Sequence, residues 1–334
     1  MNALLLRDYM KLELVQMAEP AIAAGDVLVR VRACGICGSD VHGLDGATGR
    51  RIPPLVMGHE AAGEVAAVGS GVSDLRVGDR VTFDSTISCG HCPYCARGEA
   101  NLCDHREVLG VSPGPYRRHG AFAEYIAVPR PIVYRLPDNL TFEQAALIEA
   151  VSVAIHAVAL TPLRPQDSVA VVGSGMIGLL VVQALRHAGC ARVVAIDTNE
   201  QRLRLARQLG ATATANAADA GAVRDLDAAI ECVGASEPVA AALACVRKGG
   251  AVTLVGNLAA HVEFPLQAVV TRQIRVQGSC ASSGEYPAAM EMMATGAIQV
   301  DPLISAVAPL AEGPAWFDRL YRHEPGLMKV ILRP

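Results

Sequence analysis

Three closely spaced glycines constrain this chain more than any other feature of its sequence. They follow the apolar run at residues 169–172 and open a helical pattern that runs from Met176 to His187. In that setting the first glycine makes a tight turn, the second lets the backbone approach a bound anion, and the third lets helix and strand pack closely. The motif predicts a dinucleotide site at a helix N-terminus, formed by Gly173, Gly175, Met176, Ile177 and Gly178.

An acidic residue follows at the distance that such a site requires. Asp197 ends the next apolar run, about 20 residues after the glycines, where a carboxylate accepts hydrogen bonds from a ribose 2′-hydroxyl. A 2′-phosphate would be repelled there, and the next two residues, Thr198 and Asn199, are not basic. We therefore expect NAD rather than NADP, with Arg202 as the side chain that could stack on the adenine or reach a 2′-phosphate.

The second half of the chain alternates strand-like and helical segments. Apolar runs recur along it, at residues 169–172, 193–196, 228–230, 251–255 and 274–277. Helical patterns lie between them, and the alternation predicts an α/β fold with a parallel, doubly wound sheet and right-handed crossovers. The Ala-rich residues 213–222 are expected to form a surface connection. The first 140 residues instead show the pattern of short strands, so we place a domain boundary near residues 149–155.

Composition excludes several classes of partner. The formal net charge is −4 over 334 residues with no basic run, so the chain lacks the electrostatic footprint of a nucleic-acid binder. No stretch reaches the roughly 18 apolar residues of a membrane span, and the N-terminal apolar run is too short for a secretion signal. We therefore expect a cytoplasmic protein, in which clustered cysteines, of ten in all, hold metal more often than they form disulfides.

Four cysteines lie close together in the first half, at positions 89, 92, 95 and 103. Four thiolates at this spacing can surround one Zn²⁺ tetrahedrally, with Zn–S distances of about 2.3 Å, and leave no open position. Cys89, Cys92, Cys95 and Cys103 therefore predict a structural zinc site. The alternative is a redox-sensing thiol cluster without metal. The neighbouring His91 and His105 are interpreted as solvated loop residues rather than ligands.

A second group of potential ligands comes from two separate loops. Cys37 follows the strand-like run at residues 27–32, and His59 and Glu60 precede the run at residues 63–69. A thiolate, an imidazole and a carboxylate suit a zinc ion that keeps one position open for water or substrate. Such an ion stabilises negative charge on a bound oxygen, so these residues predict a catalytic zinc site.

The same segments resemble a known family. Residues 58–72, which begin Gly-His-Glu-Ala-Ala-Gly and end Val-Gly-Ser-Gly-Val, are similar to the signature of the zinc-containing medium-chain alcohol dehydrogenases. Residues 35–42, Gly-Ile-Cys-Gly-Ser-Asp-Val-His, and residues 147–156 resemble its polyol branch, the sorbitol and galactitol-1-phosphate dehydrogenases. The resemblance covers essentially the whole chain, and the motifs follow in the same order.

This resemblance implies a fold and an assembly. We expect a Rossmann domain over residues 153–286, and a β-rich GroES-like catalytic domain over residues 1–152 that is completed by about 287–334. The resemblance also implies a homodimer or homotetramer.

It further implies roles for individual residues. Cys37 and His59 would bind the catalytic zinc with Glu60 as third ligand, and Glu149 would hold the zinc-bound water or exchange with it. Asp40 would orient the zinc-bound imidazole. The resemblance also implies that Ser39 and His42 form a proton relay. It places Val233, Val255 and Gly256 beside the nicotinamide.

The expected reaction is NAD-linked oxidation of a secondary alcohol on a small polyol, a sugar alcohol or its phosphate, to a ketose. Hydride would leave a zinc-bound alkoxide for the nicotinamide. L-Threonine 3-dehydrogenase and vicinal-diol (butanediol) dehydrogenase are alternatives within enzymes. A zinc-free quinone reductase is disfavoured by Cys37 and the cysteine cluster. A catalytically inactive NAD(H)-binding sensor is the alternative from another class.

Two departures from sorbitol dehydrogenases bear on the substrate. Gly43 stands where they often place an aromatic residue, and residues 278–282 contain no arginine. These small residues predict a roomier pocket, in which Ser279, Ser282 or Ser283 would donate hydrogen bonds to substrate hydroxyls. Arg117 and Arg118 form a guanidinium pair that could bind a sugar-phosphate tail, although such pairs are more often surface charges.

Overall fold

The computed structural model describes residues 1–112 and 118–334. Contacts within the chain divide it into two compact units. Unit 1 consists of Met1–Glu149, Tyr286–Ala294 and Val300–Pro334. Unit 2 consists of Ala150–Glu285 and Thr295–Gln299. The chain therefore leaves unit 1 after Glu149 and returns to it for its last segment.

Unit 1 is built from β-strands with short helices between them. One sheet has the order β2-β1-β4, a larger sheet runs β10-β6-β5-β3-β18-β17 with β9 also paired to β3, and β7 pairs with β8. The strands are β1 (Asn2–Asp8), β2 (Lys11–Gln16), β3 (Asp26–Gly35), β4 (Leu55–Val56), β5 (Glu60–Val68), β6 (Arg80–Phe83), β7 (Thr86–Ile87), β8 (Glu107–Val108), β9 (Tyr125–Pro129), β10 (Val133–Arg135), β17 (Ile304–Pro309) and β18 (Lys329–Arg333). Alternating residues of β3 are buried, because one face of the sheet covers the core.

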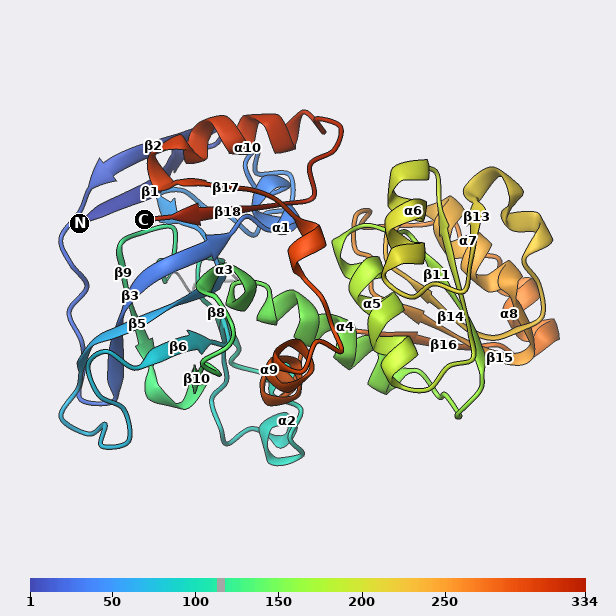
Figure 1. The fold of residues 1–334 in the computed structure, drawn as a ribbon, viewed down its shortest axis with the longest axis horizontal. Helices are drawn as coiled ribbons and strands as arrows, with labels where there is room; N and C mark the ends of the chain where they lie inside the picture. Colours follow the sequence, from blue (N-terminus) through green and yellow to red (C-terminus); the bar gives the residue numbers. More distant parts are fainter. Residues whose placement is uncertain (113–117) are drawn as a thin grey trace. The chain divides into compact units, whose positions relative to one another are not determined.

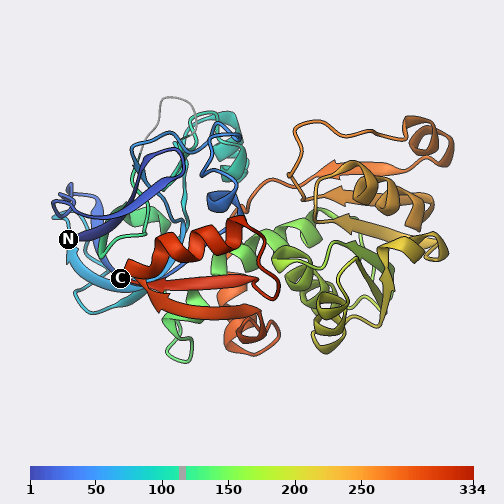
Figure 2. The same cartoon turned by 90° about the horizontal axis from the view of Figure 1, so that it is seen from above.

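The helices of unit 1 are short and lie mostly at the ends of strands. They are α1 (Gly38–Val41), α2 (Pro93–Ala96), α3 (Phe142–Ala145), α9 (Tyr286–Ala294) and α10 (Gly313–Tyr321). The C-terminal strand β18 pairs with β3 through Ile331 and Gly35, and both views show α10 beside the β17–β18 pair (Figure 1, Figure 2). The end of the chain therefore lies next to the strand that leads to Cys37.

Unit 2 contains one parallel six-stranded sheet in the order β13-β12-β11-β14-β15-β16. The strands are β11 (Ser168–Val172), β12 (Arg192–Asp197), β13 (Ala213–Asn216), β14 (Leu226–Glu231), β15 (Val246–Leu254) and β16 (Arg275–Gly278). The helices are α4 (Ile148–Leu160), which begins in unit 1, α5 (Met176–His187), α6 (Glu200–Gln208), α7 (Ser236–Cys245) and α8 (Leu266–Arg272). Strand order reverses at β11, so right-handed crossovers place helices on both faces of the sheet (Figure 2).

The expected α/β class is thereby confirmed, with one local error. Residues 213–222 are not merely a connection, because they form the edge strand β13 and the 3-10 helix Ala217–Ala222. β13 lies at the edge of the sheet, and each of its residues is only half-buried. An edge strand does not need the apolar run that identified the inner strands. Within the described residues, no helix combines the length and the apolar character needed to cross a membrane.

Candidate active site and cofactor sites

Cys37, His59 and Glu60 meet in unit 1. Cys37 lies just after β3, His59 lies just before β5, and Glu60 is the first residue of β5. Antiparallel pairing of the two strands sets Gly35 opposite Glu60, which brings both loops to the same sheet edge. One ligand atom from each of the three residues lies within 4.8 Å of the others. A thiol, an imidazole and a carboxylate at these separations fit a zinc ion.

Acidic groups beside His59 favour its protonated form in the absence of a cation. Burial opposes the charge, but Asp40 and Cys37 outweigh it and raise the pKa of His59 well above its usual value. Nδ1 of His59 lies 3.4 Å from Oδ1 of Asp40, a separation longer than a well-formed hydrogen bond. A cation among these groups would replace the proton, which is a second indication that the residues fit a metal.

Asp40 and Ser39 share a buried arginine. The guanidinium of Arg51 donates from Nε and Nη2 to Oδ1 of Asp40, at 3.1 and 2.8 Å, and from Nη2 to Oγ of Ser39 at 3.0 Å. Oγ of Ser39 also lies 3.5 Å from Nε2 of His59. His42, at the end of α1, is exposed, with its ring centroid 6.5 Å from that of His323. Of the two predicted relay residues, Ser39 thus lies near the buried imidazole of His59, and His42 is exposed.

Glu60 has a buried cationic partner from the end of the chain. Nζ of Lys329 lies 2.5 Å from Oε2 of Glu60 and donates to the carbonyl oxygen of Ile36 at 3.2 Å. Burial opposes the charge on Lys329, but Glu60 outweighs it and raises the pKa of the ammonium group. One carboxylate oxygen of Glu60 is therefore already bound by an ammonium group.

Glu149 lies near the group but does not join it. It stands in the first turn of α4, and its carboxylate is not among the atoms that lie within 4.8 Å of one another. Burial is the main cause that raises the pKa of Glu149 to about 7, with Glu60 acting in the same direction and His59 against it. This carboxyl group can therefore exchange a proton near neutral pH.

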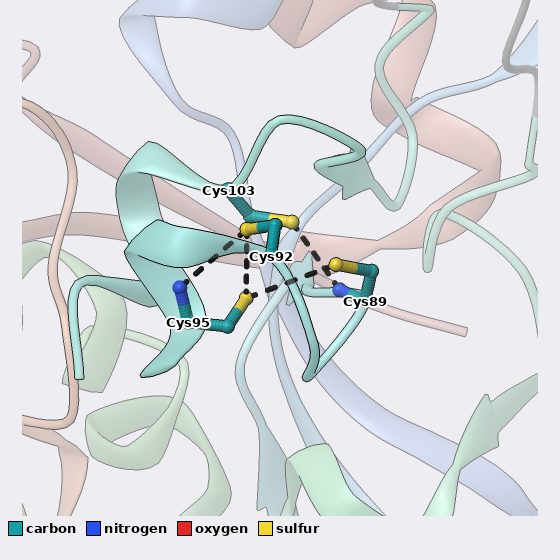
Figure 3. A group of neighbouring side chains, drawn as sticks. All are labelled: Cys89, Cys92, Cys95 and Cys103. Atoms are coloured by element: carbon teal, nitrogen blue, oxygen red, sulfur yellow. Dashed lines mark hydrogen bonds between the residues drawn. The ribbon is translucent and has the colours of Figure 1, made fainter. Parts of the chain in front are cut away.

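The four cysteines of the first half also meet, as Figure 3 shows. Their sulfur atoms all lie within 4.8 Å of one another, and neither His91 nor His105 belongs to the group. Sγ of Cys92 lies 3.5 Å from Sγ of Cys95, and no disulfide joins them. The sulfurs come from the loop around α2 and from the turn that precedes β8.

Backbone donors point at these sulfurs in the manner expected for thiolates. The N–H groups of Cys89 and His105 donate to Sγ of Cys103, both at 3.3 Å, and the N–H of Cys95 donates to Sγ of Cys92 at 3.5 Å. The Cys95 N–H is the main cause that lowers the pKa of Cys92 to about 6, whereas burial raises that of Cys103 to about 11. A divalent cation would let all four ionise together, so the cluster fits a structural zinc.

The glycine motif of unit 2 has the geometry of a dinucleotide turn. Gly173 has a φ of +93°, and Gly175 is the N-cap of α5, which begins at Met176 and continues through Ile177. A Cβ at Gly178 would overlap the carbonyl oxygen of Gly173, so only glycine allows helix and strand to approach this closely. Backbone N–H groups at the start of the 12-residue helix are available to a phosphate.

Asp197 ends β12 beside this turn. Its Oδ2 accepts from the N–H of Ser174 at 2.6 Å and its Oδ1 from the N–H of Asn199 at 2.8 Å, which fixes the carboxylate. Asn199 caps α6 through the N–H of Arg202, whose side chain is exposed. An oriented acid and an exposed guanidinium therefore both stand at the end of β12.

Glu231 holds together the segments that follow β14 and β15. Its carboxylate accepts from the N–H groups of Val233 and Gly234 at 2.7 and 2.9 Å. Its carbonyl oxygen accepts from Val255 and Gly256 at 2.8 and 3.1 Å. The two segments expected beside the nicotinamide thus form one connected surface.

The residues expected to shape the substrate pocket differ in their surroundings. A Cβ at Gly43 would overlap Cγ of Arg51, so the space predicted there is already filled, whereas a Cβ at Gly278 would meet nothing within 4 Å. Ser282 is buried, and Oγ of Ser279 is buried without a partner among the described residues. Ser283 is half-buried, and its N–H donates to Glu285.

The proposed phosphate anchor is weakened. Arg117 lies outside the described residues. Nη2 of Arg118 donates to the carbonyl oxygen of Ala127 at 2.9 Å, and the side chain is only 29% exposed. Nδ1 of His119 accepts from the N–H of Val56 at 3.1 Å. Both described side chains are therefore engaged in structural contacts.

Sequence reasoning missed Arg51 and Lys329. Arg51 carries no signal in the sequence beyond its place eight residues before His59. Lys329 does carry one, because it is a lone cation at the start of the apolar run Val-Ile-Leu of β18. A buried cation in a strand needs an anionic partner, which would have pointed to one of the site carboxylates.

Comparisons with known proteins agree with the geometry. The family descriptions "Alcohol dehydrogenase GroES-like domain" and "Zinc-binding dehydrogenase" match residues 23–138 and 177–295. Sorbitol dehydrogenase of Bacillus subtilis is 34% identical over an alignment that covers 100% of this chain and 97% of the relative.

Two solved structures are similar over the whole chain. One is a candidate zinc-binding dehydrogenase of Sinorhizobium meliloti solved with NADP, at 34% identity, with a TM-score of 0.92 and coverage of 100% and 99%. The other is galactitol-1-phosphate dehydrogenase of Escherichia coli, at 28% identity, with a TM-score of 0.91 and coverage of 100% of both chains.

Motif, fold and overall similarity thus agree along the whole length of the chain. It belongs to the zinc-containing medium-chain alcohol dehydrogenase family, in the polyol dehydrogenase branch, and its cofactors are zinc and a nicotinamide dinucleotide.

Proposed function

We propose that the protein oxidises a secondary hydroxyl of a small polyol to a ketone and transfers the hydride to NAD. The observation that carries this proposal is the group formed by Cys37, His59 and Glu60, whose ligand atoms lie within 4.8 Å of one another. Cys37, His59 and Glu60 would hold a zinc ion, which would supply the Lewis acidity that an alcohol needs to lose its proton near neutral pH. The glycine turn of unit 2 would hold the dinucleotide, which would supply the hydride acceptor.

The chain's own residues would manage the proton. Oγ of Ser39 lies 3.5 Å from Nε2 of the buried His59, so its hydroxyl would take the substrate's proton. His42 would pass that proton to solvent. Asp40 would hold the imidazole of His59, and Glu149, with its pKa raised to about 7, would act as a second proton acceptor beside the group.

The coenzyme preference rests on Asp197. Its carboxylate is fixed by Ser174 and Asn199 and is 8% exposed at the end of β12. A carboxylate there pairs with ribose hydroxyls and repels a 2′-phosphate, which favours NAD. The exposed Arg202 works in the opposite direction, so NADP is expected as a poorer coenzyme rather than an excluded one.

The substrate class follows from the neighbours and the site. Relatives are named as sorbitol dehydrogenase, L-idonate 5-dehydrogenase and D-xylulose reductase, and one similar structure is a butanediol dehydrogenase. Because Arg118 is engaged elsewhere, we favour an unphosphorylated polyol.

We also propose that the chain forms a homodimer or homotetramer through unit 2. β16 is an edge strand whose four residues are all exposed. Large apolar side chains are also exposed on α8, the helix that precedes β16 in the chain, including Leu266 and Val270. An open strand edge with apolar neighbours is the usual basis of pairing between chains.

The test combines metal analysis with a substrate panel. Zinc per chain is measured first, and NADH absorbance is then followed with sorbitol, xylitol, galactitol 1-phosphate, threonine and butanediol, each with NAD and with NADP. We expect about two zinc ions per chain, the highest kcat/KM with a free polyol, and a preference for NAD.

Variants make the test specific. Cys37→Ser should abolish turnover and leave NAD binding intact, whereas Cys190→Ala removes a buried thiol of unit 2 and should keep turnover. Full activity in Cys37→Ser would contradict the catalytic zinc. Threonine as the best substrate would contradict the polyol assignment.

A further inference from the structure

Arg51 is a buried cation with two acceptors of different function. Its side chain is 2% exposed, and that of Asp40 is 0% exposed. The guanidinium donates two hydrogen bonds to Oδ1 of Asp40 and a third to Oγ of Ser39. One acceptor stands behind the imidazole of His59, and the other is the hydroxyl placed to take the substrate's proton.

A guanidinium is suited to this double contact. Its donors are fixed in one plane, so two acceptors on consecutive residues are held at a set separation. An ammonium group is a single point and cannot reproduce the fork. Burial of the charge is costly, and the charged hydrogen bonds to Asp40 offset that cost.

Gly43 makes room for this side chain. A Cβ at Gly43 would overlap Cγ of Arg51 and lie 3.0 Å from its Cβ. Gly43 follows His42 directly, so the aliphatic part of Arg51 packs against the end of α1 that carries the proposed relay. Arg51 can therefore follow this path only because residue 43 has no side chain.

We propose that Arg51 is a positioning residue for the proton relay, because it fixes Ser39 and Asp40 at the same time. This proposal rests on the function proposed above. A hydroxyl has two lone pairs and one hydrogen, and Arg51 occupies one lone pair of Ser39. The other lone pair remains for the incoming proton, and the hydroxyl hydrogen is directed away from the guanidinium. The same guanidinium also holds Oδ1 of Asp40, which lies 3.4 Å from Nδ1 of His59, so Arg51 sets the position of the carboxylate that faces the imidazole.

The test compares Arg51→Lys, which keeps the charge, with the wild type. We expect kcat to fall by about tenfold to a hundredfold, because proton transfer is impaired. The KM for NAD and the zinc content should stay within about twofold of the wild-type values, because the variant does not change coenzyme or metal binding. The solvent deuterium isotope effect on kcat should rise. In a Ser39→Ala background the same substitution should lower kcat less than about threefold, since the hydroxyl that Arg51 positions is already gone.

A measurement without turnover tests the Asp40 contact. In protein loaded with Co²⁺, Arg51→Lys should shift the visible absorption bands, because a freed Asp40 no longer fixes the imidazole ligand. Arg32→Lys is the matched control, since Arg32 makes two hydrogen bonds to Glu64 in the same unit. That variant should leave kcat, the isotope effect and the spectrum unchanged.

The outcomes separate this proposal from the proposed function. A wild-type protein inactive on every alcohol of the panel would contradict the function itself. An active wild type with Arg51→Lys unchanged in kcat and spectrum overturns the role of Arg51. An equal loss of kcat with and without Ser39 overturns it too, because the effect would then not pass through the relay hydroxyl.

Discussion

Asp40 and Arg51 form an ion pair in which both charged groups are buried and no longer hydrated. Burial favours the neutral acid, but His59 and Arg51 outweigh it and hold the pKa of Asp40 well below its usual range. A buried pair of this kind adds little net stability relative to an apolar pair, yet loss of one partner leaves the other charge without compensation. The pair therefore makes the region around α1 sensitive to substitution.

We expect Asp40→Asn to lower the free energy of unfolding by about 3–5 kcal/mol, because it keeps the shape of the side chain and leaves the guanidinium unpaired. Urea denaturation of the zinc-loaded protein at neutral pH measures this difference. Asp74→Asn is the control: Asp74 also binds an arginine, Arg130, but is 61% exposed. It should cost less than about 1 kcal/mol. Equal costs for the two variants would show that the charge of Arg51 does not depend on Asp40 for compensation.

The residues of the site differ in how far the sequence could identify them. Metal ligands are few in type, so Cys37, His59 and Glu60 were predicted from type and position, and they do lie together. Arg51 and Lys329 act through partners that only the fold brings near, and Lys329 is 269 residues from Glu60 along the chain. No local pattern encodes such a pairing.

At the scale of elements, strong periodic patterns were the most informative. The helix expected from Met176 to His187 has those bounds in the structure, because a glycine turn fixes its start and the apolar face of α5 packs on the sheet. The edge strand β13 was missed, since its half-buried alanines and threonine lack the contrast of an inner strand. The ends of elements are thus predictable where a motif marks them.

The cysteine-containing segment between β7 and β8 is too small to fold by its own core. Its helix α2 has four residues, none of them buried, and the buried side chains around it include Cys92 and Cys103. A segment of this size needs another source of order, and a closed zinc site supplies it. The structural zinc is therefore expected to control local order rather than turnover.

We expect Cys92→Ser to reduce zinc from about two ions to one per chain and to speed amide exchange in this segment by about tenfold or more, with much of kcat retained. Metal analysis and exchange measured by mass spectrometry test this. His91→Ala is the control, because His91 contacts the carbonyl oxygen of Cys89 but lies outside the sulfur group. If His91→Ala also loses one zinc, the four-thiolate set is wrong.

At the scale of the whole molecule, unit 1 depends on the last stretch of the chain. The C-terminal strand β18 pairs with β3 and delivers Lys329 to Glu60. The surroundings of Glu60 are thus completed by a segment that follows unit 2 in the sequence. The chain order of this return was expected from the resemblance to the family, since no composition shift marks it.

The two edges of the sheet in unit 2 differ in a way that bears on assembly. The residues of β13 are all half-buried, whereas those of β16 are all exposed. Val276 of β16 is 38% exposed, and Val270 of the preceding helix α8 is 69% exposed. An open edge of this kind would let a monomer aggregate through strand pairing. We therefore expect the edge to pair with the same strand of a second chain about a two-fold axis.

Val276→Lys should therefore shift the protein toward monomers, because pairing would place two lysines close together across the axis and bury their charges. Sedimentation velocity over a range of protein concentrations measures the shift. Val77→Lys makes the same chemical change at a valine of unit 1 that is 67% exposed and belongs to no strand, so it should leave the association state unchanged. If the wild type sediments as a monomer at micromolar concentration, or if Val276→Lys associates as the wild type does, β16 is not the interface. Apolar residues of α8 would then need another explanation.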